Sequence, residues 1–339
     1  GKESLADNTT GNENVAIGNN ALEKNTTADN NVAIGFEALT SNTTGHSNTS
    51  VGRTSLNANS TGNNNTAVGM GSLESNTTAS NNTAVGKDAL QSNTTGTDQT
   101  AVGFSALKDY TGNGYNTAIG RSALESLTTG EKNVAVGAQA MDAATTADQS
   151  VVIGYNAGSA ITTGDFNTAI GYQALKTATT GQRNTVVGHE AGEAITTGAY
   201  NQALGMAALE ACTTGENNTT MGYNSLNVCA TGSGNTAMGS YAADAYTANN
   251  ITAVGYYAAS AATTGGGNVA VGYEALLSNT TGDNNTAIGF EAMESTTTGT
   301  NNTAVGSQAL DAHTTSHSNS GFGFGALGGV TTGGNNVGV

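Results

Sequence analysis

The feature that most constrains this chain is an internal repeat of seventeen residues. A glycine, most often at the end of an Ala-Val-Gly or Ala-Ile-Gly triplet, recurs from Gly1 to Gly239 in steps of seventeen. The next step, to Gly255, is sixteen residues, and the period of seventeen then continues through Gly323. Twenty units, one of them a residue short, account for all 339 residues. A repeat architecture is therefore the first hypothesis.

The repeat predicts a single elongated solenoid over residues 1–339, interrupted only by the one-residue deletion between 239 and 255. In such arrays each unit contacts only its neighbours. The chain has no Trp, no Pro, eleven Tyr and six Phe, so we expect a thin core. Because Gly1 stands in the repeat frame without a Met, we expect a segment of something longer or a processed subunit.

The charge excludes one large class of partners. The formal net charge is -16, and no Lys or Arg follows Arg183. Nucleic-acid binding needs a basic surface, so we expect none. No stretch has the length and apolarity of a membrane span, so we also expect no membrane insertion within this segment.

Positions within a unit are numbered here as columns 1 to 17, starting at the repeated glycine. All charged residues fall in columns 2, 3, 6, 7, 12 and 13, which predicts that these columns face solvent. Column 4 is Ala or Ser, column 5 is mostly Leu, and both should be buried. Where the side chain in column 5 is small, the side chain in column 8 is large, which indicates that the two columns share one core. The pairs are Gly158 with Ile161, Gly192 with Ile195, and Ala243 with Tyr246.

Columns 14 to 17 read as a short strand, with aliphatic or β-branched residues in columns 15 and 17 and mostly Ala in column 16. We expect the Thr and Val of column 15 to be buried. Column 14 is nearly always Asn, which predicts a ladder of side-chain hydrogen bonds between coils. Column 11 is mostly Gly, with Asn113 in one unit, which predicts a left-handed turn residue there.

Columns 1 to 8 carry a helix-like pattern, with columns 1, 4, 5 and 8 inside. Helix axes need about 8 to 10 Å between them, whereas strands stack at about 4.8 Å. We therefore predict a β-rich repeat solenoid of twenty coils, each a short parallel strand plus a tight helical turn. The alternative is an α/β solenoid with a true short helix in each repeat.

Several units resemble repeats of known fibrous proteins. The segments "NVAIGNNAL", "NTAIGYQAL" and "NVAVGYEAL" are similar to head repeats of trimeric autotransporter adhesins. They resemble even more closely the repeats of bacteriophage tail fibres and related bacterial surface fibres. The resemblance implies a parallel β-roll, usually of three chains, that serves outside the cell as a stalk or an adhesive head. The unit here is longer than that of the adhesin roll.

Column 2 holds more aromatic residues than any other column. Three interpretations compete for this stripe: an interface between chains, a platform for sugar rings, and a stacked ladder that covers the turn. Large exposed aromatic rows usually mark contact with a partner. The stripe consists of Phe36, Phe104, Tyr155, Tyr172, Tyr223, Tyr256, Tyr273, Phe290 and Phe324.

Cys212 and Cys229 occupy column 8 of adjacent units, so they should be stacked on one another inside. They form either a disulfide, which an oxidising exterior favours, or a pair of packed thiols. The histidines occupy scattered columns without a carboxylate or cysteine cluster of metal spacing, so we expect plain loop histidines and neither metal nor cofactor. They are His46, His189, His313 and His317.

Seven asparagines of column 8 begin Asn-Thr-Thr or Asn-Ser-Thr and are glycosylation sequons. A composition this rich in Asn and Thr produces sequons by chance, so they allow modification without indicating it. They are Asn8, Asn25, Asn42, Asn59, Asn76, Asn93 and Asn279.

An enzyme breaks its repeats where catalytic residues converge, and this chain keeps them, so we predict no enzymatic activity. The leading hypothesis is a structural, self-associating segment of an extracellular fibre, on a cell surface or a virion appendage. Its partner would be itself, as a homotrimer or as an end-to-end or lateral filament. The alternative is an adhesin module whose aromatic stripe binds surface glycans or a receptor. Ice binding is a minor alternative, because column 15 looks buried.

Overall fold

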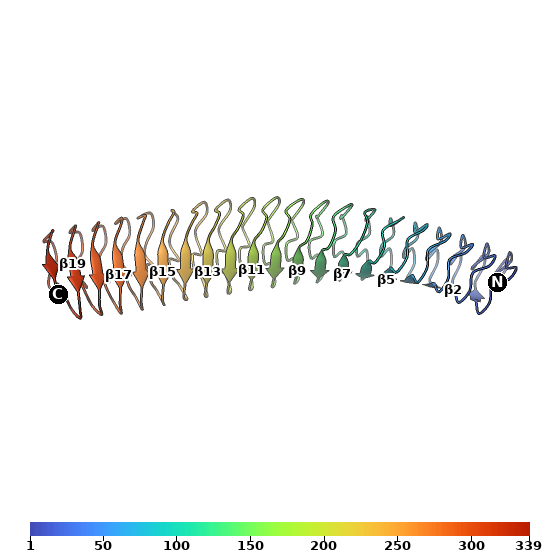
Figure 1. Ribbon diagram of the computed structural model, residues 1–339, viewed down its shortest axis with the longest axis horizontal. Helices are drawn as coiled ribbons and strands as arrows, with labels where there is room; N and C mark the ends of the chain where they lie inside the picture. The colour runs from blue at the N-terminus through green and yellow to red at the C-terminus, as the bar shows by residue number, and fades with distance from the viewer. The chain divides into compact units, whose positions relative to one another are not determined.

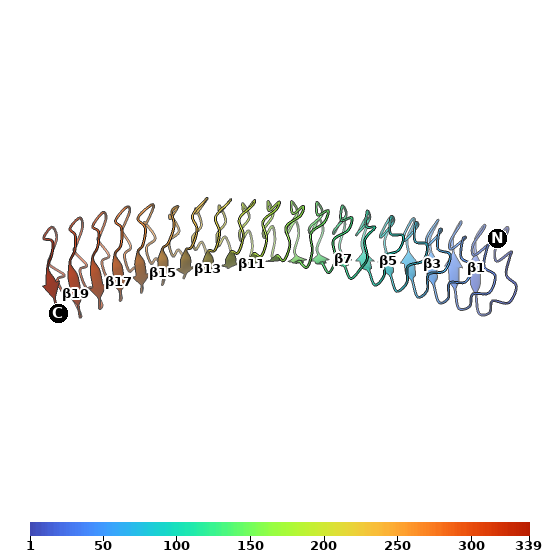
Figure 2. The same ribbon diagram turned by 45° about the horizontal axis from the view of Figure 1, so that its top comes forward.

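The computed structural model describes residues 1–339 and divides into two compact units, Gly1–Asn167 and Thr168–Val339. Each unit is a stack of coils, and each coil contributes one short strand (Figures 1 and 2). The first unit contains β1 (Val15–Ile17), β2 (Val32–Ile34), β3 (Thr49–Val51), β4 (Thr66–Val68), β5 (Thr83–Val85), β6 (Thr100–Val102), β7 (Thr117–Ile119), β8 (Val134–Val136) and β9 (Val151–Ile153).

The second unit contains eleven strands of the same kind. They are β10 (Thr168–Ile170), β11 (Thr185–Val187), β12 (Gln202–Leu204), β13 (Thr219–Met221), β14 (Thr236–Met238), β15 (Thr252–Val254), β16 (Val269–Val271), β17 (Thr286–Ile288), β18 (Thr303–Val305), β19 (Ser320–Phe322) and β20 (Val337–Gly338). The two units are described separately, and a single solenoid over 1–339 stays a prediction.

Strands of successive coils pair in parallel, each residue with the residue one repeat further along the chain. Val15 lies opposite Val32 in the first unit, and Val269 lies opposite Thr286 in the second. Across the short coil Thr236 pairs with Thr252, so the deletion changes the loop and leaves the strand register intact. The predicted parallel β-solenoid of seventeen-residue coils is confirmed. The structure has no helix, and so none that could cross a membrane.

The stretch predicted as a tight helical turn consists of two consecutive tight turns. In one coil the Ala38 N–H donates to the Gly35 carbonyl at 3.4 Å, and the Asn42 N–H donates to the Leu39 carbonyl at 3.3 Å. Leu39 has a left-handed backbone, with a φ of 53°. The same left-handed conformation recurs in columns 3 and 5 throughout the chain. This alternation rules out the true short helix.

The left-handed residues orient their backbone N–H groups along the stack axis, toward carbonyl groups of the neighbouring coils. The Leu39 N–H donates to the Ser55 carbonyl of the next coil, and the Glu37 N–H donates to the Asn19 carbonyl of the preceding one, both at 2.9 Å. A helix would have used these groups within the coil. Hydrogen bonds between coils therefore offset the cost of about 1 kcal/mol or more for a left-handed residue that is not glycine.

Column 1 requires glycine in both units. Gly52 and Gly205 have φ values of 137° and 136°, a conformation that residues with side chains rarely adopt. A Cβ added at either position would lie 2.5 Å from the carbonyl oxygen of the next column-1 glycine. The backbones of neighbouring coils thus touch here without room for a side chain.

The prediction of a left-handed residue in column 11 is wrong. Gly45 and the other column-11 glycines lack a positive φ, and the left-handed residue of this loop is in column 13, for example Ser47 with a φ of 58°. Glycine is favoured in column 11 by crowding, because a Cβ at Gly198 would lie 2.5 Å from the Gly215 carbonyl oxygen. The alanines that occupy this column, such as Ala28, also lack a positive φ, so the column does not require a left-handed residue.

The interior is formed by columns 4, 5, 8, 14 and 16. The prediction that a large side chain in column 8 compensates for a small one in column 5 is confirmed. A Cβ at Gly158 would lie 2.8 Å from the Cδ1 atom of Ile161, and one at Gly192 would lie 2.9 Å from that of Ile195. The isoleucine therefore fills the volume that column 5 leaves. Valine in column 16 fills more of this volume. The Cγ1 atom of Val152 would lie 3.3 Å from a Cβ at Gly158.

The predicted asparagine ladder of column 14 is also confirmed. The Asn31 Oδ1 atom accepts from the Asn48 backbone N–H at 2.9 Å, and its Nδ2 atom donates to the Gly45 carbonyl at 2.9 Å. The Asn31 backbone N–H in turn donates to the Asn14 Oδ1 atom. These buried amides pair backbone groups of the loop that would otherwise lack partners.

Candidate interaction surface

Columns 15 and 17 face solvent, and column 16 faces the core. Ala33 is fully buried in β2, whereas Val32 and Ile34 on either side of it are not. The expectation that column 15 is buried is therefore wrong. The interior is already filled by columns 5 and 8, so the strand can contribute only a methyl group to it.

Columns 15, 17 and 2 together form one outward surface, which we call the apolar band. The exposed large apolar side chains of the structure lie in these three columns, with the exceptions of Tyr115, Phe166, Tyr200 and Val228. No charged residue occurs in column 15 or column 17 of any coil. Exposed apolar surface of this kind usually marks an interaction site.

The apolar band is hollowed at β11, β12 and β13. A shallow depression of about 300 Å³ lies there and is lined by Thr185, Val187, Gln202, Leu204 and Met221, together with neighbouring residues of the same strands. Leu204 and Met221 are 46% and 45% exposed. This part of the apolar band can accept side chains from a partner.

All nine aromatic residues predicted in column 2 are exposed, from 38% for Tyr223 to 81% for Phe324. In the second unit several of them stack on one another. The ring centroids of Tyr256 and Tyr273 are 5.7 Å apart, and those of Tyr273 and Phe290 are 5.2 Å apart, with nearly parallel planes. Their faces cover each other, so mainly ring edges point outward. This favours a ladder or an interface over a platform for sugar rings.

Two further tyrosines that the sequence analysis missed extend this ladder from column 3. Tyr241 and Tyr257 stack with centroids 4.8 Å apart and planes 4° apart. Tyr223 meets Tyr241 edge to face at 5.2 Å, and Tyr256 meets Tyr257 at 4.5 Å. The available signal was that Tyr241 and Tyr257 occupy column 3 of adjacent coils. The aromatic cluster is Tyr223, Tyr241, Tyr256, Tyr257, Tyr273 and Phe290.

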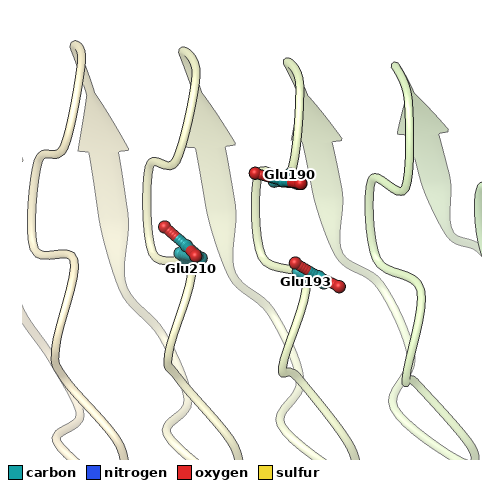
Figure 3. Close-up of side chains that lie close together, drawn as sticks. All are labelled: Glu190, Glu193 and Glu210. Carbon is teal, nitrogen blue, oxygen red and sulfur yellow. The ribbon is translucent and has the colours of Figure 1, made fainter.

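Three carboxylates from two adjacent coils meet in the second unit (Figure 3). Single oxygen atoms of Glu190, Glu193 and Glu210 all lie within 4.8 Å of one another. Oxygen ligands in such a group suit a hard cation. Here Lys176 pairs with Glu193 at 2.9 Å, and the Asn227 Nδ2 atom donates to Glu210 at 2.9 Å. The signal that could have found this group is the seventeen-residue spacing of Glu193 and Glu210, which places both in column 6 of adjacent coils.

Cys212 and Cys229 are both buried and free, so the disulfide interpretation is not realised in this structure. Burial raises the pKa of the Cys212 thiol to about 12 and also raises that of Cys229. The Asn235 Nδ2 atom approaches the Cys229 sulfur at 3.5 Å. Both side chains pack as small apolar groups of column 8.

The sequon asparagines form a second interior ladder. The Asn59 Nδ2 atom donates to the Asn42 Oδ1 atom at 2.9 Å and to the Gly62 carbonyl at 3.1 Å. Of the seven, Asn8 alone is partly exposed, and the other six are fully buried. A glycan on a buried amide nitrogen is incompatible with this packing, so the sequons at those six positions are structural.

His313 is a core residue and not the plain loop histidine that the sequence predicted. It is fully buried in column 8, where its Nε2 atom lies 3.0 Å from the Asn319 Nδ2 atom and its Nδ1 atom lies 3.3 Å from the Thr296 hydroxyl. Burial lowers the pKa of His313. His46, the half-exposed His189 and His317 lie outside the core.

Comparison of the chain with models of known protein families and with curated proteins found no match. The structure itself establishes a parallel β-solenoid with an apolar band on one face and a polar interior ladder.

Proposed function

We propose that this chain is a structural, non-catalytic segment of an extracellular fibre or filament whose copies associate through the apolar band. The observation that carries the proposal is the band itself, whose columns 15 and 17 carry no charged residue on any coil. Burial of apolar surface stabilises association by about 25 cal/mol for each Å² removed from water. A long repetitive face can therefore accumulate a large stabilisation from small contacts.

A second copy of the chain is the partner that fits this face best. Only another coil stack has the same spacing, so its side-chain rows can interdigitate with this band coil for coil. The hollow at β11 to β13 offers one place for such a row. The resemblance to tail fibres and surface fibres supports the same conclusion and favours a homotrimer or a filament on a cell surface or virion appendage.

The test compares lysines placed on and off the apolar band. Leu204→Lys combined with Met221→Lys should abolish self-association measured by analytical ultracentrifugation, because it would bury two charges. Val228→Lys is the matched control, because Val228 is 41% exposed in column 7. Equal association of both variants and the unmodified chain would contradict the proposal.

Ice binding is a second candidate, because column 15 faces outward. β3 to β7 present five successive threonines and, beside them, a row of Val or Ile, which makes a regular array of hydroxyl and methyl groups. Freezing-point depression that Thr83→Lys removes would favour this function. No effect of the unmodified chain on ice growth would eliminate it.

The adhesin alternative requires ligand contact with the aromatic residues of column 2. Tyr273→Ala should then abolish adhesion to glycan-bearing cells and leave fibres intact. The covered ring faces of the aromatic cluster disfavour this outcome, because sugars bind aromatic faces and not edges.

A further inference from the structure

Column 2 differs in charge between the two units. In the first unit it carries Arg53, Lys87 and Arg121, which follow one another at every second coil and are exposed. Lys87 pairs with Asp88 at 3.3 Å and lies 5.4 Å from the Phe104 ring centroid. Arg53 and Arg121 take part in none of the ion pairs of the structure. Two guanidinium groups thus stand unpaired in column 2, at the side of columns 15 and 17 of the apolar band.

In the second unit the same column carries aromatic rings, and acids lie next to them. Glu274 and Glu291 occupy column 3, directly after Tyr273 and Phe290. Each of these carboxylates is half-buried. The Gln308 side chain donates to Glu291 at 2.8 Å, but no Lys or Arg follows Arg183 in the chain. This acidic and aromatic row therefore has no nearby cation from its own unit.

The excess of negative charge here affects the pKa of a neighbouring carboxyl group. Burial raises the pKa of Glu294, and the charges of Glu291, Glu274 and Asp311 raise it further. Like charges held together in this way favour any partner that brings cations. Arginine is the most suitable cation, because it both stacks on aromatic rings and bridges carboxylates.

We propose that the cation row of one copy (Arg53, Lys87 and Arg121) docks on the aromatic and acidic row of a second copy (Tyr273, Glu274, Phe290 and Glu291). The inference rests on the proposed self-association and specifies its orientation. Arg53 or Arg121 would gain carboxylate and ring partners that it lacks within its own copy. The apolar bands of the two copies would then lie against each other alongside these contacts.

This contact joins two different surfaces, so it is heterologous and can propagate. Each copy keeps a free cation row and a free acidic row after one contact has formed. Heterologous contacts that do not close into a ring generate filaments. The cations recur at about 10 Å, two coil spacings, whereas the acidic row has a ring and a carboxylate on each of two successive coils. Because Arg53 and Arg121 lie four coils apart, one guanidinium group at a time lies opposite the two carboxylates.

The test is a charge reversal with rescue. Arg53→Glu with Arg121→Glu should raise the concentration of half-association at least tenfold in low salt, and so should Glu274→Arg with Glu291→Arg. An equimolar mixture of the two variants should assemble like the unmodified chain, because both kinds of contact regain opposite charges. Lys108→Glu with Lys132→Glu is the control, since it changes the charge equally in the same unit but outside column 2.

The outcomes separate the two proposals. If the unmodified chain stays monomeric, the proposed fibre function fails and this inference fails with it. If it assembles and both reversed variants assemble equally well, the heterologous contact is wrong while the fibre stands. The heterologous contact is also wrong if both reversed variants associate weakly and their mixture does too. A thermal unfolding temperature equal to that of the unmodified chain would show that the variants are folded.

Discussion

The first and the second unit share their strands, their column-1 glycines and their column-14 amides, yet they differ in columns 8 and 2. In the first unit column 8 begins with six consecutive asparagines, from Asn8 to Asn93. In the second unit the same interior position holds Cys212, Cys229, Tyr246 and His313 among others. Column 2 on the surface changes from cations interspersed with aromatic rings to a stacked aromatic cluster.

This difference separates what the coil requires from what it tolerates. The constant columns meet requirements of the backbone. The column-1 glycines allow the backbones of neighbouring coils to approach closely, and the column-14 amides are hydrogen-bond partners for loop carbonyl and N–H groups. Column 8 only has to fill a volume and satisfy its own polar atoms. Column 2 points to solvent and is free to carry the charges and rings that distinguish one part of the chain from another.

The largest expected effect concerns the feature that the two units share. Gly52→Ala and Gly205→Ala should each destabilise their unit severely, by about 4 kcal/mol or more, because of strain and contact with the next coil. Urea unfolding measures the loss. Gly329→Ala is the control, because a Cβ there meets nothing within 4 Å. Tolerance of either column-1 variant would contradict the close backbone stacking.

A smaller effect should distinguish the interiors of the two units. Asn59→Ala leaves the buried Asn42 Oδ1 atom without its hydrogen bond, at a cost of about 1–3 kcal/mol. Cys229→Ala in the same column should cost only about 1 kcal/mol, because it removes one atom and no strong hydrogen bond. Chemical denaturation would compare them. Equal losses would show that the asparagine ladder adds nothing beyond packing.

A pH effect from a buried histidine should appear only in the second unit. Burial lowers the pKa of His313, so the unfolded chain binds a proton more readily than the folded chain does. The stabilising contribution of neutral His313 is present above the unfolded pKa of about 6.5 and is lost as the pH falls from there through the lower folded pKa. Hydrogen exchange should therefore show looser coils around His313 at pH 5 than at pH 7.

The matched variant is His313→Asn, because asparagine is the residue that column 8 uses elsewhere. It should remove this dependence on pH, while the coils around Asn59 should respond weakly in both proteins. Identical pH profiles for the variant and the unmodified chain would exclude His313 as the cause.

The smallest expected effect is on the rate at which Cys212 and Cys229 are alkylated. Both thiols are buried and their pKa values are raised, that of Cys212 to about 12, so little reactive thiolate exists in the folded chain. Alkylation by iodoacetamide at pH 8 should proceed only as fast as these coils open, and urea should restore the rate of an ordinary cysteine. Fast labelling of the folded chain would contradict the buried positions.

The sequence predicted the solenoid, its parallel strands, the solvent-facing columns and the asparagine ladder, because each follows from a strict periodicity. It could not predict that column 15 faces outward, since Thr and Val suit either side of a strand. It placed the left-handed residue in column 11, although crowding and not φ selects glycine there. The repeat places Tyr241 above Tyr257 in column 3 and Glu193 above Glu210 in column 6. The contacts between different columns, Tyr256 with Tyr257 and Glu190 with Glu210, depended on the exact stacking.

The most direct test of the proposed fibre is electron cryo-microscopy of the purified chain at high concentration. We predict fibres of more than one chain, with an axial repeat of about 4.8 Å and the apolar bands facing each other. Single, separate chains at every concentration, with the apolar band open to solvent, would contradict it.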